Sequence, residues 1–225
     1  MNQQELTQIA ARGISEQQIE KQLEQIKNVF PFLRLEGAAA IGKGIMSPDA
    51  EEVKKYEQVW NEYKKQGHRI VKFVPASGAA SRMFKDLFAF LDAPYDVPTT
   101  DFEKHFFDNI KKFAFRKSLC SKCKENEGSC VCDLIKAGKY KAVVANLLKE
   151  SGLNYGQLPK GFLQFHEYSD EEVRTPMEEH LVEAALYASS NGEANVHFTV
   201  SHDHLELFEK MVAEKVDGYA KKFGV

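Results

Sequence analysis

The sequence has 225 residues, of which 43% are hydrophobic and 28% charged, and its formal net charge is −3. These proportions are typical of a soluble globular protein and exclude a disordered or collagen-like chain. No apolar run approaches the roughly 20 residues needed to cross a bilayer. The N-terminus has neither the basic start nor the apolar core of a secretory signal, so we expect a cytoplasmic protein with no membrane partner.

The first 66 residues predict a helical N-terminal extension. Two helices are expected over residues 1–12 and 15–30, because Gly13 separates them and Ser15 with Gln18 forms a capping box for the second. A third helix is expected to open at Ser47-Pro48 and to close at Gly67.

The most informative stretch follows an apolar strand at 69–74. Small or backbone-defining residues run from Pro75 to Ser81, then comes Arg82, and a helix is predicted from Ser81 to about Leu91. A strand, a loop of small residues and a helix start form a common phosphate site, because small side chains let backbone N–H groups approach an anion. A tight strand-to-helix turn selects the same small residues, so both interpretations stay open. The candidate nucleotide-binding residues are Ala76, Ser77, Gly78, Ala79, Ala80 and Ser81, and Arg82 adds a fixed positive charge beside them.

Residues 86–157 predict a helical insertion, with helices near 101–117 and 139–150. Residues 104–149 carry 11 Lys and Arg against 4 Asp and Glu, a local balance of +7. Such a segment is either a solvated surface or a patch that attracts phosphates or nucleic acid. Five phenylalanines are expected to pack as a core face: Phe102, Phe106, Phe107, Phe113 and Phe115. All of these except Phe102 could instead stack bases, although their spacing suits a core better.

All four cysteines of the chain lie within this insertion, at Cys120, Cys123, Cys130 and Cys132. Four thiolates can complete a tetrahedral zinc shell, and the first pair has good ligand spacing. The second pair is separated by a single residue, a closer spacing than zinc ligands usually have. A structural zinc and four free thiols in a reduced compartment are therefore both open.

The C-terminal third predicts alternating strands and helices. Pro159-Lys160 leads into a short apolar alternation at 162–165, and Thr175-Pro176 opens a capped helix that runs to about Ser190. A second strand is expected at 196–200, and a last helix follows. A parallel sheet of only two or three strands needs neighbouring elements to cover it. We therefore expect the N-terminal part of a larger domain, or a chain that requires a partner segment or a second copy.

These motifs resemble those of sugar-1-phosphate nucleotidyltransferases. The loop Ala76-Ser-Gly-Ala-Ala-Ser-Arg-Met83 is similar to their glycine-rich signature, with Ser77 and Ala80 where that family has glycines, and Pro159-Lys160 is similar to its second part. The chain is identified as a member of the bacterial domain-of-unknown-function 4301 family, over about residues 14–215, which resembles UDP-sugar pyrophosphorylases. The resemblance implies an α/β, Rossmann-like (GT-A-like) fold with a largely parallel sheet over residues 67–225, apparently incomplete at its C-terminus.

The resemblance also implies a reaction. A nucleoside triphosphate and a sugar 1-phosphate would give a nucleotide sugar and pyrophosphate, with Arg82 and Lys160 as the catalytic cations and Mg²⁺ as cofactor. We find no carboxylate for that metal, which leaves open whether this chain alone is active. The alternative function is a non-catalytic, zinc-containing module that contacts protein or nucleic acid through residues 104–149, although nucleic acid is the less favoured partner.

Overall fold

The computed structural model describes residues 2–29, 32–169 and 171–225. The chain divides into two compact units, one up to residue 54 and one from residue 55 to the end. The division falls inside helix α3 (Ala50–Lys65), which the Asp49 carboxylate caps by accepting the N–H groups of Glu51 and Glu52, both at 2.9 Å.

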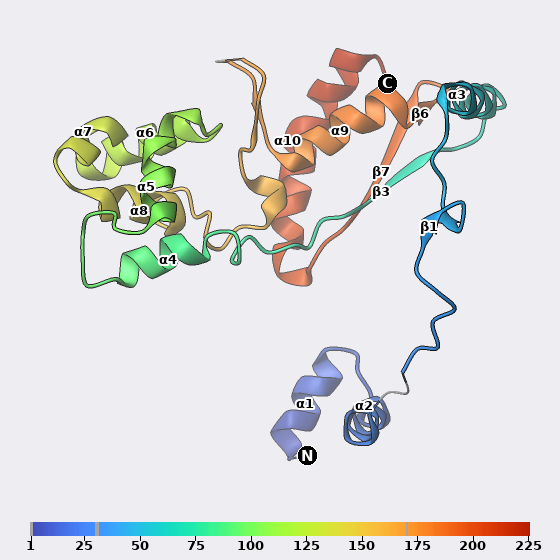
Figure 1. Ribbon diagram of the computed structural model, residues 1–225, viewed down its shortest axis with the longest axis horizontal. Helices are drawn as coiled ribbons and strands as arrows, with labels where there is room; N and C mark the ends of the chain where they lie inside the picture. Colours follow the sequence, from blue (N-terminus) through green and yellow to red (C-terminus); the bar gives the residue numbers. More distant parts are fainter. Residues whose placement is uncertain (1, 30–31, 170) are drawn as a thin grey trace. The chain divides into compact units, whose positions relative to one another are not determined.

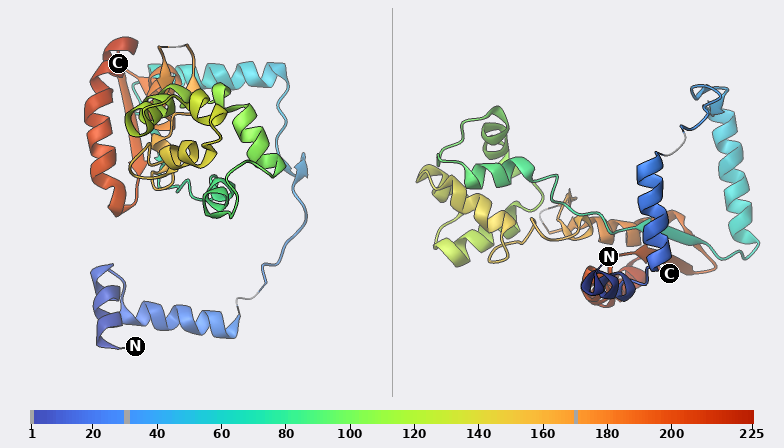
Figure 2. Two further views of the ribbon diagram at one scale, coloured as in Figure 1. Left: turned by 90° about the vertical axis from the view of Figure 1, so that its left-hand side faces the viewer. Right: turned by 90° about the horizontal axis from the view of Figure 1, so that it is seen from below.

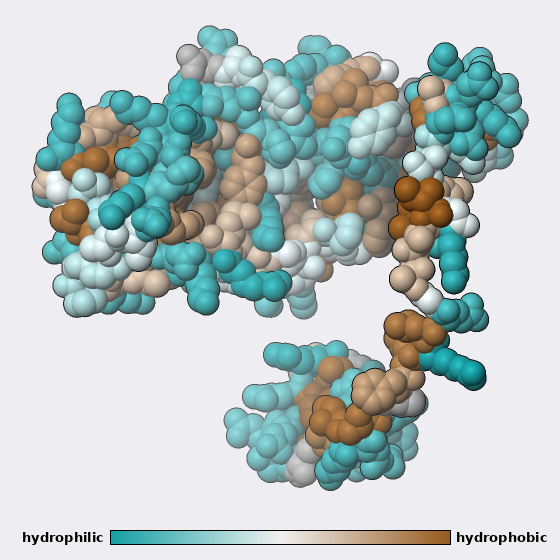
Figure 3. Space-filling model, viewed as in Figure 1, coloured by the Kyte–Doolittle hydropathy of each residue, from teal (hydrophilic) through white to brown (hydrophobic). Residues whose placement is uncertain are grey.

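The first unit holds helices α1 (Gln3–Ala11) and α2 (Glu16–Asn28) and a minimal parallel pair, β1 (Ala40–Ile41) and β2 (Gly44–Ile45). The predicted break at Gly13 is confirmed by its left-handed backbone, and the Ser15 hydroxyl accepts the Gln18 N–H as expected. Residue 30, the predicted end of the second helix, lies outside the described residues. Neither helix buries a described side chain, and Figure 3 shows apolar surface on this unit.

The second unit is built on a three-stranded sheet in the order β3 (Val71–Pro75), β7 (Glu193–Thr199), β6 (Ser189–Ser190). Strands β3 and β7 are parallel, whereas β6 and β7 are antiparallel. On one face of β3, Val71 and Phe73 are exposed. On the other face, the Lys72 ammonium forms a 2.6 Å ion pair with Glu183 of α9 (Pro176–Tyr187). A second, two-stranded sheet joins β4 (His166–Glu167) to β5 (Val173–Arg174).

The start of α9 is the one that the sequence predicts. Thr175 caps it, Pro176 occupies its first turn, and the Glu178 carboxylate accepts the Thr175 N–H at 2.9 Å to complete the capping box. Helix α10 (Leu205–Phe223), the long red helix at the edge of the left view in Figure 2, follows the short turn η3 (His202–His204) and packs along α9. The Lys215 ammonium joins the two helices by pairing with Glu178 at 2.9 Å.

The remaining helices form a bundle with its own core (Figure 1). They are α4 (Lys85–Asp92), α5 (Asp101–Asp108), the turn η1 (Ile110–Lys112), α6 (Arg116–Glu127), α7 (Val131–Lys136) and α8 (Tyr140–Leu148). The fully buried Leu147 and Leu148 of α8 lie at the centre of this core. The core takes in Phe106, Phe107 and Phe115, with Phe113 packed against it, as predicted, whereas Phe102 is 43% exposed and the prediction for it is wrong.

The prediction of a Rossmann-like, GT-A-like fold with a largely parallel sheet is wrong. In the described part of the chain helices predominate, and only β3 with β7 and the two-residue pair β1–β2 are parallel. The segment after α4 does not return to the sheet as crossover connections would, because it folds on its own aromatic core. The predicted alternation at 162–165 is not a strand either, since η2 (Lys160–Phe162) precedes it and the Phe162 ring packs edge-on against Phe208.

Across the described residues, no helix combines the length and the apolar character that crossing a bilayer requires.

Candidate functional site

The predicted phosphate loop lies directly after β3, and its residues differ in availability. The Ala76 N–H donates to the Thr199 carbonyl at 2.8 Å, so it extends the sheet and is not free for a ligand. Ala80 is 1% exposed and belongs to the helical core. The other four predicted loop residues face solvent: Ser77, Gly78, Ala79 and Ser81. The loop surface that a ligand can reach is therefore narrower than the sequence predicts.

Lys160 lies against this loop, as the paired motifs require. Ala79 forms an antiparallel bridge with Pro159, and the Lys160 N–H donates to the Gly78 carbonyl at 3.0 Å. The Lys160 Cδ stands 3.9 Å from the point that a Cβ on Gly78 would occupy. The buried Pro159 anchors this contact, so the two segments are held together although they are distant in sequence.

Arg82 supplies a second exposed cation at the end of the loop. It lies in a turn in which the Met83 N–H donates to the Ala80 carbonyl at 2.9 Å. Neither Arg82 nor the Lys160 ammonium forms an ion pair with any carboxylate in the described ranges. Both positive charges therefore stay available for an anion.

The helix after the loop begins later than predicted. It starts at Lys85 rather than at Ser81, and Phe84 precedes it without a side-chain cap. The N–H groups at the helix start are thus displaced from Ser77 and Gly78 along the chain. Anion binding at the loop rests on its own N–H groups and on the two cations rather than on a helix dipole.

An aromatic cleft of about 340 Å³ is lined in part by Met83, the residue that follows Arg82 in the chain, while Arg82 and Lys160 are not in its lining. Its walls include Met83, Phe102, Phe113 and Phe165, and its fringe carries polar side chains such as Gln164. The Gln164 side-chain oxygen accepts a hydrogen bond from the Ser118 hydroxyl at 2.7 Å, which fixes its orientation. A flat ring fits such a lining, because aromatic faces stack on aromatic faces.

The four cysteines occupy two neighbouring helices, with Cys120 and Cys123 in α6 and Cys130 and Cys132 at the start of α7. Cys123 is fully buried, and burial, helped by neighbouring Cys120, raises its pKa to about 11. The Cys130 thiol donates to the Asp133 carboxylate at 3.0 Å. Over residues 2–29, 32–169 and 171–225, no three or more His, Cys, Asp or Glu side chains are grouped to hold a metal, so the geometry lends no support to a zinc shell.

Cysteine accessibility gives a test of this arrangement. In the native protein at pH 8, we expect a maleimide to label Cys120, Cys130 and Cys132 while Cys123 stays unmodified, because a buried thiol with a raised pKa supplies almost no thiolate. Peptide mass spectrometry before and after unfolding in urea reads out each site. Protection of all four thiols, lost on adding a chelator, would contradict four free thiols and favour zinc.

The alternative of a binding face on residues 104–149 loses three of its four phenylalanine side chains, and the fourth, Phe113, is partly buried. Phe106, Phe107 and Phe115 are at most 7% exposed, so they cannot stack on bases. The basic side chains of the segment form a surface over this core, as a solvated lysine-rich face does.

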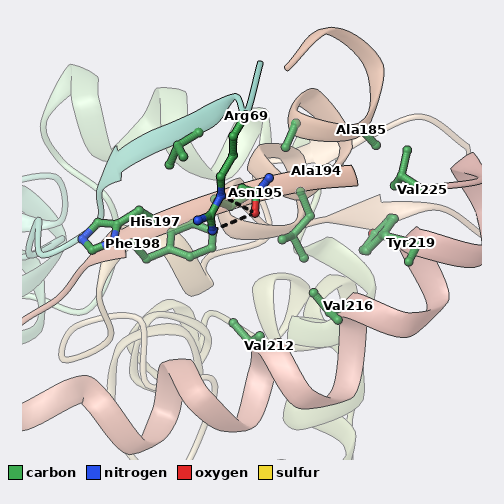
Figure 4. A pocket seen from close by; sticks show the side chains of 15 residues that line it. Arg69, Ala185, Ala194, Asn195, His197, Phe198, Val212, Val216, Tyr219 and Val225 are labelled. Carbon is green, nitrogen blue, oxygen red and sulfur yellow. Dashed lines mark hydrogen bonds between the residues drawn. The ribbon is translucent and has the colours of Figure 1, made fainter. Parts of the chain in front are cut away.

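A cavity of about 630 Å³ lies elsewhere in the second unit, between β7, α9 and α10 (Figure 4). Val212 and Val216 project into it from α10, and Leu181 and Ala184 line it from α9. At its rim, the Arg69 guanidinium donates to the Asn195 side-chain oxygen at 3.1 and 3.3 Å.

The sequence did not single out Arg69, Asn195 or Tyr219, which border this cavity. The available signal was the apolar face of the last helix, which continues through Val212 and Val216 to Tyr219. An apolar helix face predicts burial against a neighbour, and nothing in its spacing predicts that the neighbour leaves a gap.

Comparison with known proteins identifies a family. The model of the family described as "Domain of unknown function (DUF4301)" matches residues 2–225, so the chain belongs to that family. Neither the curated proteins nor the solved structures contain a match. The membership agrees with the family resemblance of the sequence, whereas the resemblance to nucleotidyltransferases finds no support in these comparisons.

Proposed function

We propose that this member of the DUF4301 family binds a nucleotide, with the phosphates held by Ser77–Arg82 and Lys160. The observation that carries the proposal is the contact between the loop and Lys160, in which the Lys160 N–H donates to the Gly78 carbonyl. Two segments that share a phosphate-site pattern meet there, and each brings an exposed cation without an acidic partner in the described ranges. Such cations bind phosphate oxygens through charge-assisted hydrogen bonds.

The aromatic cleft favours a nucleotide over a simple phosphate. It begins at Met83, directly after Arg82, and presents aromatic rings to a ligand. A nucleobase in the cleft and phosphates on the loop would occupy adjoining surfaces. Stacking of a base on such side chains contributes about 1–3 kcal/mol.

The reaction that we propose for the site is nucleotidyl transfer to a sugar 1-phosphate. An oxygen of the sugar phosphate forms a bond to the α-phosphorus, the bond from that phosphorus to the β-phosphate oxygen breaks, and pyrophosphate leaves. Arg82 and Lys160 would stabilise the negative charge that grows on the leaving group. Among the described residues no three or more His, Cys, Asp or Glu side chains are grouped to hold a metal ion, and no step is derived through Mg²⁺.

Thermal shift with nucleoside triphosphates tests the binding. A ligand at 100 times its Kd stabilises the folded protein by about 2.7 kcal/mol, and we expect at least one nucleotide to raise the melting temperature of the wild type. Arg82→Ala and Lys160→Ala should each weaken binding about 10- to 100-fold, because each removes a charged donor. Lys149→Ala, which removes an exposed lysine outside the loop, should bind normally.

Inorganic triphosphate separates the two parts of the site. It should bind more weakly than a nucleotide but show the same dependence on Arg82 and Lys160. A wild type that responds to neither ligand, or variants that respond as the wild type does, would refute the proposal.

A further inference from the structure

The cavity between β7, α9 and α10 is large enough to hold a ligand. Its volume of about 630 Å³ falls in the range of roughly 300–1,000 Å³ that is typical of small-molecule sites. Protein interiors are close-packed and contain few voids larger than a water molecule. An apolar group that moved from water into a space of this size with apolar walls would therefore gain binding free energy.

The walls of the cavity are apolar over three elements. Strand β7 contributes Ala194, Val196 and Phe198, α9 contributes Leu181 and Ala184, and α10 contributes Val212 and Val216. Val216 is 38% exposed and stands where the cavity meets solvent. A hydrocarbon group that entered here would exchange water for these side chains, which is favourable in proportion to the apolar area covered.

One cation stands at the rim without a counter-charge. Arg69 is the only Lys, Arg, Asp or Glu among the described residues that line the cavity, and its guanidinium contacts the neutral amide of Asn195. None of the ion pairs between described residues includes Arg69. Since a guanidinium has five N–H donors and Asn195 takes two, the others stay available to an anion.

The other polar groups of the lining do not offset this charge. The Tyr219 hydroxyl donates to the Glu178 carboxylate at 3.3 Å, and burial raises the Tyr219 pKa to about 12, so this side chain is neutral. The His197 ring is stacked on Phe73 with the ring centres 5.0 Å apart. The lining side chains therefore combine apolar walls with the positive charge of Arg69.

We propose that this cavity binds a small amphipathic anion, with its carboxylate or phosphate head on Arg69 and its hydrocarbon tail between β7 and α10. The head would accept charge-assisted hydrogen bonds from the guanidinium, whose planar fork of donors matches two oxygens of a carboxylate or a phosphate. The tail would cover Val196, Val212 and Val216. This site is separate from the phosphate loop and does not depend on the function proposed for it.

Calorimetric titration with decanoate, decyl phosphate and decanol, all as monomers, tests the proposal. We expect the wild type to bind both anions, and to bind decanol about tenfold or more weakly, since decanol lacks the head charge. Shortening the acid should weaken binding about three- to fourfold for each methylene removed. The relative affinities of decanoate and decyl phosphate identify the head that the site prefers.

Three variants locate the site. Arg69→Gln should reduce the affinity for decanoate about tenfold and leave decanol unchanged, because only the charge is lost. Val216→Trp should abolish binding of both by filling the cavity, and circular dichroism checks that it folds. Arg82→Ala, which affects the phosphate loop alone, should bind decanoate as the wild type does.

Two outcomes would overturn the proposal. One is a wild type that binds neither decanoate nor decyl phosphate at millimolar concentration. The other is binding of decanoate that Arg69→Gln leaves unchanged, which would place the ligand elsewhere. Because nucleotide binding responds to Arg82 and not to Arg69, failure here leaves the phosphate-loop proposal intact, and the reverse also holds.

Discussion

Replacing Phe90 with alanine is expected to lower the free energy of unfolding by about 3–5 kcal/mol. Phe90 is fully buried in α4, and its ring centre lies 5.9 Å from that of Phe107 and 6.0 Å from that of Tyr95. Alanine would remove these contacts and leave a cavity that the surrounding rings fill only in part. Domains are commonly stable by about 5–15 kcal/mol, so the loss would take a large share of the total.

Urea unfolding followed by far-ultraviolet circular dichroism measures this effect, and Phe102→Ala is its control. Phe102 belongs to the neighbouring helix α5 but is 43% exposed, so its truncation should cost less than about 1 kcal/mol. Equal losses in the two variants would mean that Phe90 is not at the centre of a packed core.

Helix starts were the part of the fold that the sequence predicted best. Thr175, Pro176 and Glu178 fix the beginning of α9 through bonds that span three residues, so no distant contact is needed to form them. Ser15 behaves in the same way at the start of α2. One predicted helix start is wrong, because the helix expected from Ser81 begins at Lys85, where no side chain caps it.

The fold class could not be predicted because it depends on long-range pairing. The strand pattern at 69–74 and 196–200 is correct, and β3 and β7 do pair in parallel. What failed was the expectation of a largely parallel sheet to which the short alternation at 162–165 would add a strand, since that segment continues from η2 and Phe162 packs against Phe208. Helices α6 and α7 lie inside the predicted helical insertion, but neither was predicted individually, since the cysteine-bearing segment lacks a regular apolar period, and packing against α8 stabilises them.

The candidate site also has one part that the sequence predicted and other parts that depend on contacts between distant segments. A shared motif predicted that Lys160 lies with the loop, and the bridge between Ala79 and Pro159 holds them together. The unavailability of Ala76 could not be predicted, because it results from a hydrogen bond to Thr199 across the sheet. The cavity beside Arg69 was equally hidden, since it arises where three elements meet and no single segment carries its pattern.

Replacing Gly152 with alanine is expected to destabilise the protein by about 3 kcal/mol. Gly152 lies in the turn after α8, where its added Cβ would stand 2.0 Å from the backbone oxygen of Asn146. That oxygen already accepts the Leu153 N–H at 2.8 Å, and the buried Asn146 side chain bonds to Asn126 at 2.6 Å. Backbone cannot move aside as a flexible side chain can, so the end of α8 must shift together with its buried leucines.

Gly218→Ala provides a control of opposite sign. Gly218 lies inside α10, and an added Cβ there meets nothing within 4 Å. Alanine should stabilise the protein by about 0.5–1 kcal/mol, because glycine in a helix loses more backbone freedom on folding. Both free energies come from the same urea titration. A Gly152→Ala variant as stable as the wild type would contradict the close contact between the turn and the backbone of α8, since a Cβ at residue 152 would then fit without a clash.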